Sequence, residues 1–378
     1  MTLVRRAAVG TVAVVTALAL SACGKSVTSG GGSGGNAAAT PAEKVYAQLN
    51  GLPAAQQRAE AVRQAKQEGA LSLYTSLTEE LVKPVKEGFE KQFGIKVQVF
   101  RASSETVLQR ALQEGSANRA GNDAIETNFG EMGTLTRQGL LGDYGGASLA
   151  NVPQNGRFDR WAADRLNVML PAWNTELIKP GQEPQSWEDL ADPRFKGKLT
   201  LELSDYDWYE NVSKYWLANG KTQAQVDDLW KRIVANANVA KGHTTMADLL
   251  AAGQTAVDAM NYSYITQNTA DKGAPVAYRS ADGKAHPPAF ARPQGVAVMK
   301  GAKHPAAGWL FNDWMLNEGQ KLLVSLGLTP SVKVPGDRSL DGITLRPYDV
   351  QGLLDPASAK HWEDAYDGLL RGVKEIGS

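Results

Sequence analysis

The sequence predicts an α/β fold that is divided into two lobes. With 378 residues, of which 43% are hydrophobic, the chain is globular in composition and too long for one small domain. Apolar, alternating runs typical of strands are separated by helical stretches of roughly 10 to 15 residues. Because parallel strands need such crossovers, this alternation favours a mainly parallel sheet with right-handed connections.

The charge balance gives no reason to expect nucleic acid as a partner. Lys plus Arg and Asp plus Glu number 40 each. Two of the basic residues, Arg5 and Arg6, lie in a segment that we expect to be removed and that holds no acid. The mature chain then has 38 basic and 40 acidic residues, a net charge of about −2.

Residues 1–22 are expected to be a lipoprotein signal peptide. Two arginines precede an apolar run over 7–20, which is too short for the roughly 20 residues of a membrane span. Small residues then lead into Cys23, the one cysteine of the chain, in an arrangement that resembles the bacterial lipobox. We expect lipidation of Cys23 to anchor the mature protein to the cell membrane on its extracytoplasmic side, at the cell surface or in the periplasm. The alternative is a structural cysteine behind a plain signal peptide, although a lone cysteine forms no disulfide framework.

A Gly/Ser-rich stretch comes next and is expected to be a flexible tether over 23–45. Its composition has no apolar periodicity. Pro53 then opens an Ala- and Gln-rich helical stretch that ends at Gly69. The ordered body is expected to start near this helix.

Three strands, each followed by a helix, are predicted at 70–76, 95–104 and 123–128. Ligands of parallel sheets bind beyond the carboxyl ends of the strands. Those ends hold polar or aromatic candidates for the first-lobe half of a binding site, namely Tyr74, Thr75, Ser76, Arg101, Ser103, Ser104 and Asn128. The two serines also fit a helix N-cap, so their hydroxyls have a structural alternative.

A second set of elements is predicted farther along the chain. It comprises strands at 166–174, 255–264 and 292–302, a helix at 223–236 and a long helical pair at 304–327. A fold with two lobes needs the chain to cross between them and return, which we expect near 164–171 and 289–298. The first lobe is then 46–167 with 292–332, and the second lobe is 168–291 with 333–378.

Catalytic motifs are missing from the sequence. The four histidines stand in no metal-binding spacing, and there is neither a G-x-S-x-G elbow nor a G-x-x-x-x-G-K-[ST] phosphate loop. We therefore expect neither an enzyme nor a cofactor.

Three stretches carry a resemblance to a known family. They are SWEDLADPRFKGKLTL at 186–201, HPAAGWLFNDWMLNEGQ at 304–320 and GLTPSV at 327–332. Together with the lipobox, they resemble the extracytoplasmic solute-binding proteins of bacterial ABC importers, in the group of ferric-iron type, over roughly 68–334. The resemblance implies a two-lobed clamp of the type II periplasmic-binding-protein class, with discontinuous lobes joined by hinge strands. It also implies a monomer that closes on its ligand and works with an ABC permease and ATPase.

The ferric binders of this family coordinate Fe(III) through a His and a Glu of the first lobe and two adjacent tyrosines of the second. Oxygen ligands suit this hard ion. The resemblance aligns Tyr262 with the first tyrosine and Ser263 with the second, which leaves Tyr264 one place late. No His follows the first strand, and Asn128 stands where the Glu is expected. Tyr262 is thus a candidate metal ligand and Fe(III) a candidate solute, but these departures favour a small polar organic molecule.

The two tyrosines have a further interpretation. If the strand over 255–262 continues, Tyr262 and Tyr264 point to the same face of the sheet and can flank one ligand. The alternative is an aromatic pair that only packs under the second lobe.

Two loops are expected to complete the second-lobe half of the site. Asp205, Tyr206 and Trp208 follow the strand KLTLEL, while His243 and Thr244 open another helix. Acidic residues at a helix N-terminus repel an anion unless a cation intervenes, or they serve as caps. Trp208 is either a stacking wall or a core residue.

Two functions remain open at this point. The favoured one is a lipid-anchored receptor that captures a small solute between its lobes and delivers it to a membrane permease. The alternative is a surface-anchored sensor or enzyme that uses the same clamp.

Overall fold

The computed structural model describes residues 38–117 and 121–377. The predicted signal peptide, Cys23 and most of the predicted tether lie outside these ranges. Residues from Ala39 onward form one compact unit. Within the described ranges, no helix combines the length and the apolar character that crossing a membrane requires.

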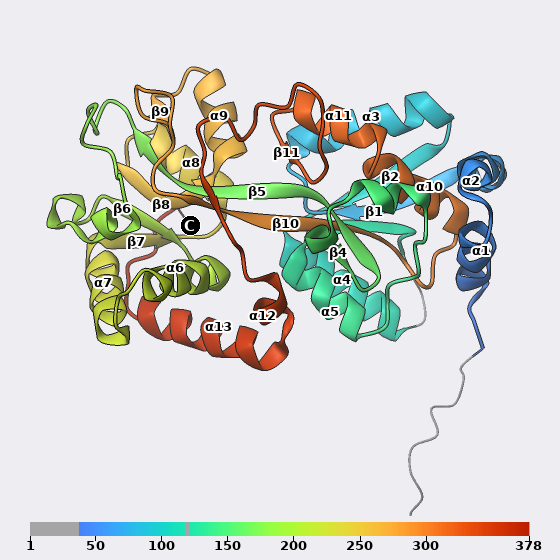
Figure 1. The fold of residues 1–378 in the computed structure, drawn as a ribbon, viewed down its shortest axis with the longest axis horizontal. Helices are drawn as coiled ribbons and strands as arrows, with labels where there is room; N and C mark the ends of the chain where they lie inside the picture. The colour runs from blue at the N-terminus through green and yellow to red at the C-terminus, as the bar shows by residue number, and fades with distance from the viewer. Residues whose placement is uncertain (1–37, 118–120, 378) are drawn as a thin grey trace, which may run out of the picture. The chain divides into compact units, whose positions relative to one another are not determined.

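Helices and strands alternate along this unit (Figure 1). The α-helices are α1 (Pro41–Asn50), α2 (Ala54–Glu68), α3 (Glu79–Phe93), α4 (Ser104–Ser116), α5 (Phe129–Arg137), α6 (Tyr206–Ala218), α7 (Gln223–Asn236), α8 (His243–Ala251), α9 (Ser263–Asp271), α10 (Pro305–Met315), α11 (Glu318–Ser325), α12 (Val350–Leu354) and α13 (Pro356–Leu370). The strands are β1 (Ala70–Thr75), β2 (Lys96–Arg101), β3 (Ala124–Asn128), β4 (Arg157–Phe158), β5 (Trp161–Asn174), β6 (Leu199–Glu202), β7 (Ala237–Ala240), β8 (Val257–Tyr262), β9 (Val276–Ala277), β10 (Ala289–Val298), β11 (Thr329–Pro330) and β12 (Leu345–Arg346). Short 3-10 helices lie at Ala147–Asn151, Gln154–Gly156, Trp187–Ala191 and Pro193–Phe195.

One sheet runs through both lobes in the order β2-β1-β3-β10-β5-β8-β6-β7. On one side β1 pairs in parallel with β2 and β3, and on the other β6 pairs in parallel with β7 and β8. Between them, β10 and β5 pair antiparallel with each other and with their outer neighbours. We call the part around β1–β3 the first lobe and the part around β6–β8 the second lobe. The long strands β5 and β10 cross between them as hinge strands (Figure 1).

The structure confirms the predicted fold class, a two-lobed type II clamp with a mainly parallel sheet and flanking helices in each lobe. The crossings expected near 164–171 and 289–298 coincide with parts of β5 and β10. The lobe boundaries given residue by residue remain a prediction.

Helix α3 illustrates why the helices form where they do. Thr78 stands at its N-cap position, and Gly94 ends it with a left-handed backbone at φ 72°. Leu81, Val85 and Phe89 recur every four residues and are all buried, so one face of the helix covers the sheet.

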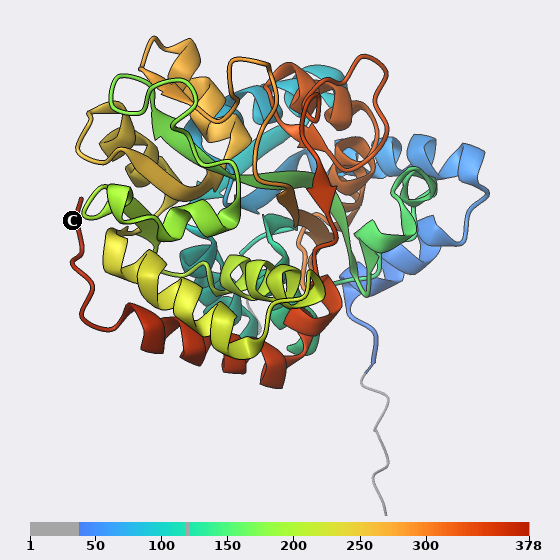
Figure 2. The same ribbon diagram turned by 60° about the vertical axis from the view of Figure 1, so that its left-hand side comes forward.

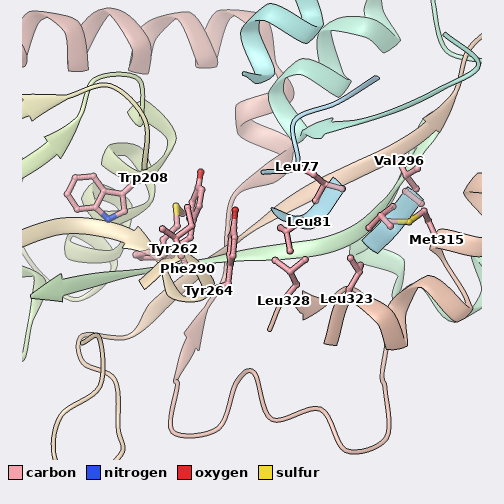
Figure 3. Packing of buried hydrophobic residues seen from close by; sticks show 14 of the residues in the cluster. Leu77, Leu81, Trp208, Tyr262, Tyr264, Phe290, Val296, Met315, Leu323 and Leu328 are labelled. Atoms are coloured by element: carbon pink, nitrogen blue, oxygen red, sulfur yellow. The ribbon is translucent and has the colours of Figure 1, made fainter. Parts of the chain in front are cut away.

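Helix α10 lies in the core over its whole length. All of its residues are buried, including Trp309 and Trp314. The HPAAGWLF motif therefore packs the core of the first lobe. Figure 3 shows neighbouring core residues along the two hinge strands, from Met315 and Leu323 to Trp208.

The expected start of the ordered body near Pro53 is wrong, and so is the C-terminal end of the predicted tether. Helix α1 already occupies Pro41–Asn50. The side chain of Thr40 accepts a hydrogen bond from the Glu43 amide while the Glu43 carboxylate accepts one from the Thr40 amide, which is a capping box. Tyr46 is fully buried and donates a hydrogen bond to the Met299 carbonyl, so α1 is fastened to the first lobe.

The last segment of the chain contacts both lobes. Strand β12 pairs with β10, and α12 packs on α5 of the first lobe. Helix α13 lies along α6 and α7 of the second lobe, which Figure 2 shows from a second side. This segment brings Tyr348 and one face of α13 to the space between the lobes.

Candidate ligand-binding cleft

Two adjoining cavities lie between the lobes. The first, of about 380 Å³, we call the basic cavity, and the second, of about 350 Å³, we call the acidic cavity. They share a wall that consists of Glu105, Asn128, Ser204, Asp205 and Arg292. The N-termini of α4, α5, α6, α8 and α9 all reach this cleft, as expected for the carboxyl ends of parallel strands.

Arg292, on hinge strand β10, is the centre of the shared wall. Only 5% of its surface is exposed. Its Nη2 donates to Asp205 Oδ1 at 2.8 Å and to Asp207 Oδ1 at 2.6 Å, and its Nε lies 2.6 Å from Asp207 Oδ2. Its Nη1 donates to the Tyr262 hydroxyl. The Tyr348 hydroxyl donates to the Asp207 carboxylate from the far side.

This cluster neutralises the two acids at the start of α6. Burial alone raises the pKa of Asp205, but the charges of His243 and Arg292 outweigh burial and lower it to about 2. The carboxylate is thus ionised and paired. The repulsion of anions that two acids predict at this helix N-terminus is offset by the intervening cation, Arg292.

Tyr262 and Tyr264 lie side by side although the strand does not continue between them. Strand β8 ends at Tyr262, and α9 begins at Ser263, so the prediction of a continuing strand is wrong. The two rings are still nearly parallel, with centroids 6.0 Å apart and an angle of 11°. Figure 3 shows their hydroxyls pointing the same way. Tyr262 is the extended N-cap residue of α9, and Tyr264 lies in its first turn. This arrangement turns the two side chains the same way, as alternate residues of a strand would be.

The basic cavity presents the amide ends of two helices. Helix α8 begins after Gly242, with no side chain that caps it, and carries His243 and Thr244 in its first turn. Helix α4 begins after Ser103, whose hydroxyl accepts from the Thr106 amide, and Ser104 accepts from the Asn128 side chain at 2.8 Å. The first amides of a helix have no partner within the helix and attract negative charge.

Three basic side chains add to this field. Arg101 and Lys241 line the cavity, and neither forms an ion pair with any residue that the structure describes. Arg165 is 2% exposed, pairs with Glu126 at 2.9 Å, and leaves its buried Nε without a hydrogen-bond acceptor. An unsatisfied buried donor that lines a cavity marks a place for an acceptor.

His243 connects the shared wall to α8. Its Nε2 lies 3.4 Å from Asp205 Oδ2, and its ring is 3.9 Å from the ring of Tyr262. Burial opposes the charged form, but Asp205 and Glu202 outweigh burial and raise the pKa of His243. Its buried Nδ1 has no hydrogen-bond partner among the described residues.

Most of the candidate site residues meet in the cleft. Those that line the basic cavity are Ser76, Ser103, Ser104, Asn128, Asp205, His243, Thr244, Tyr262 and Tyr264. Tyr206 lines the acidic cavity.

Three candidates lie elsewhere. Tyr74 donates to Glu114 behind the sheet, away from both cavities. Thr75 is fully buried and donates to Glu126, the partner of Arg165. Trp208 is 1% exposed and packs in the second-lobe core. The place of a residue at the end of a strand or helix does not reveal whether its side chain reaches the cleft.

The surroundings of Tyr262 bear on the metal prediction. Burial raises the pKa of the Tyr262 phenol well above its usual range, although Arg292 acts in the opposite direction. Across the described ranges, no group of three or more His, Cys, Asp or Glu side chains is placed to hold a metal ion. The position beside the Tyr262 oxygen is taken by the guanidinium of Arg292.

Sequence reasoning missed the charged residues that organise the cleft. Arg292, Arg165 and Tyr348 were not singled out, and neither were Glu363 and Asp367 of the acidic cavity. An arginine inside an otherwise apolar strand, as in RPQGVAV, is the one local signal available, because a buried charge needs a partner.

Comparison with known proteins identifies the family. The family model for bacterial extracellular solute-binding proteins matches residues 74–322, well over half of the chain. The Fe(3+)-binding periplasmic protein of Serratia marcescens is 26% identical over 269 residues, covering 68% of this chain and 77% of that protein. The iron uptake protein A1 of Synechocystis sp. is 24% identical over 137 residues, or 35% and 38% of the two chains.

Solved structures agree on the fold. The periplasmic binding protein AfuA from Actinobacillus pleuropneumoniae, with exogenous fructose-6-phosphate bound, has a TM-score of 0.68 at 21% identity, covering 81% of this chain and all of AfuA. Iron-bound HitA from Pseudomonas aeruginosa has a TM-score of 0.63 at 20% identity, covering 79% and 99%. The protein therefore belongs to the bacterial extracellular solute-binding protein family.

Proposed function

We propose that this solute-binding protein is the receptor of an ABC importer for a small organic anion, whose anionic group is held in the basic cavity. The proposal rests on the hydrogen-bond donors of this cavity that no carboxylate occupies among the described residues. They are the uncapped amides of α8, the side chains of Lys241 and of Arg101, whose Nε donates to the Leu77 carbonyl, and Arg165 Nε. All of them attract negative charge, and they come from both lobes.

Bare ferric iron fits this arrangement poorly. A metal bound to the Tyr262 oxygen has to lie next to the Arg292 guanidinium, which is held in place by two carboxylates. Two cations so close together repel each other strongly in a buried site. The departures from the His, Glu and Tyr-Tyr pattern favour the same conclusion.

Closure of the clamp follows from the two-sided site. The first lobe offers Ser103, Ser104 and Arg101, and the second offers His243 and Thr244. An anion that contacts both sides binds the closed form more tightly than the open form and so shifts the population toward it. The closed form is then the state presented to the permease.

The location is a further part of the proposal. Lipidation of Cys23 would anchor the receptor to the membrane on the extracytoplasmic side, beside its permease and ATPase. Labelling with a radioactive fatty acid in the producing bacterium, lost in Cys23→Ser, tests this part independently of the ligand.

Differential scanning fluorimetry of the full-length protein tests the ligand class. Sugar phosphates, alkyl phosphates and small carboxylates should raise the melting temperature, whereas Fe(III)-nitrilotriacetate should not. Arg101→Ala and Lys241→Ala should each weaken binding by about 1.5–3 kcal/mol, roughly ten- to a hundredfold in Kd.

Lys231→Ala supplies the matched control, because Lys231 is an exposed lysine of α7 that lines neither cavity. A purified protein with a visible tyrosinate-to-iron absorption band that vanishes in Tyr262→Phe would contradict the choice of an organic anion.

A further inference from the structure

The acidic cavity holds carboxylates from both lobes that have no cation partner. Glu105 and Glu131 come from α4 and α5, and Glu363 and Asp367 come from α13. None of the four forms an ion pair with a Lys, Arg or His of the described residues. Arg292 is the one basic residue that lines this cavity within the described chain, and its charge is taken up by Asp205 and Asp207.

A buried oxygen without a hydrogen-bond donor belongs to a residue of the wall that the two cavities share. Asp205 is 3% exposed, and its Oδ2 accepts no hydrogen bond from the described residues. The nearby His243 Nε2 is 3.4 Å away. An ionised carboxylate oxygen in a buried position favours an additional donor.

The carboxylates also oppose closure of the clamp. Glu105 and Glu131 belong to the first lobe, and Glu363 and Asp367 to the second, so like charges approach when the lobes do. Burial and then the charge of Glu105 raise the pKa of Glu131 to about 7. A cation in this cavity removes that repulsion and makes the closed form more favourable.

The cation suited to the cavity is organic. Three or more carboxylates placed to chelate a metal do not occur among the residues that the structure describes. The walls between the acids are Leu108, Phe129, Tyr206 and Tyr366, which offer apolar and aromatic surface. An ammonium group with its methylene chain matches such a lining through ion pairing and cation–π contact.

We propose that the ligand is a zwitterion whose anionic group lies in the basic cavity and whose ammonium group lies in the acidic cavity. The inference rests on the proposed function, because it uses the same anion site. The five shared wall residues place the two cavities directly beside each other, within reach of one molecule that contacts both sides of this wall. The cleft thus selects a ligand by its pair of opposite charges as well as by its size.

Isothermal titration of the full-length protein with two matched series of ligands tests this inference. One series is ω-aminoalkyl phosphates with two to six methylenes, and the other is alkyl phosphates of equal length. For at least one chain length, the aminoalkyl phosphate should bind at least tenfold more tightly than the alkyl phosphate of equal length. Glu131→Gln and Asp367→Asn should each bring the ratio of the two affinities toward one. Glu176→Gln, an exposed glutamate outside both cavities, is the control and should leave the ratio as it is.

The outcomes separate this inference from the proposed function. If alkyl phosphates bind as tightly as their amines at every length, the zwitterion is wrong and the anion receptor stands. If neither series binds, the zwitterion is wrong, and if the small carboxylates and sugar phosphates of the fluorimetry test do not bind either, the anion receptor is wrong as well. Stabilisation by Ca²⁺ or Mg²⁺ alone that is lost in Glu131→Gln would assign the acidic cavity to a metal and overturn the organic cation.

Discussion

The basic and acidic cavities share a wall but differ in which charges are left unpaired. Of the three acids that line the basic cavity, two are occupied, since Glu202 accepts from Gly242 and Ser204 and Asp205 pairs with Arg292. The third, Glu105, belongs to the shared wall, and the other free groups there are cations and helix amides. In the acidic cavity the cation is occupied and the free charges are carboxylates. The character of a site therefore follows from what remains after internal pairing, not from its composition.

The largest effect is expected from a substitution in the shared wall itself, because both cavities depend on its charge pairing. Arg292→Met leaves Asp207 buried without a counter-charge and Asp205 with His243 alone, which should cost about 3–5 kcal/mol of unfolding free energy in urea titrations. Arg371→Met, at an exposed arginine without an ion pair in the described chain, should change little. A loss of unfolding free energy below 1 kcal/mol for Arg292→Met would mean that Arg292 does not stabilise the two buried carboxylates.

A smaller effect is expected when the C-terminal segment loses the hydrogen bond that Tyr348 donates to the Asp207 carboxylate. Tyr348→Phe removes the hydroxyl that donates to Asp207, a hydrogen bond to a charged group that contributes about 1.5–3 kcal/mol. Stability should fall by that amount in urea titrations. Combined with Asp207→Asn the two losses should be clearly less than additive, because both act on one interaction. Simple additivity would show that Tyr348 acts elsewhere.

The basic cavity depends on the start of α8. Gly242 has φ 89° and ψ 136°, a backbone conformation that costs other residues about 1–3 kcal/mol. Gly242→Ala should lower stability by that amount and weaken binding of alkyl phosphates, as measured by unfolding and calorimetry. Gly368→Ala in α13 is the matched change, with ordinary backbone and open space around a new Cβ, and should stabilise by about 0.5–1 kcal/mol.

The affinity of the acidic cavity for an ammonium group should depend on pH. Alkyl phosphates, which have no ammonium group, report on the basic cavity alone. Burial and Glu105 hold the pKa of Glu131 at about 7, so the group is largely protonated at pH 6 and ionised at pH 8. An ammonium group binds the ionised form, so the ratio of aminoalkyl to alkyl phosphate affinity should rise about tenfold over that range.

Other charged groups near Glu131 are Glu105, Asp205, Asp207, Arg292, Glu363 and Asp367. In Glu131→Gln the affinity ratio should no longer rise between pH 6 and pH 8. If the ratio still rises in this variant, another of these groups causes the pH dependence.

Local patterns predicted the elements well, for identifiable reasons. The helix at 223–236 is found at those bounds because Thr222 and Gln225 form a capping box and Val226, Leu229 and Ile233 recur on one buried face. Ser103, His243 and Thr244 were found because strands of one parallel sheet end at one edge. Helix α1 was missed because its short length and polar surroundings resemble a tether.

The charges of the cleft could not be found in this way. Arg292 meets Asp205 across 87 positions of the chain, and Tyr348 meets Asp207 across 141. No periodicity connects residues so far apart. The same limit applies to Trp208, because a residue's place near a helix start does not say whether its side chain faces the cleft or the core.

The sequence by itself determined the alternation of strands and helices, the two-lobed class and the edge of the sheet where ligand contacts collect, because these depend on spacing and caps within a few turns. Only the tertiary structure decided which charges cancel and which remain. Pairing in a buried site depends on distances between segments that the fold brings together, and a difference of a few ångströms decides whether Arg292 neutralises Asp205 or leaves it to a ligand.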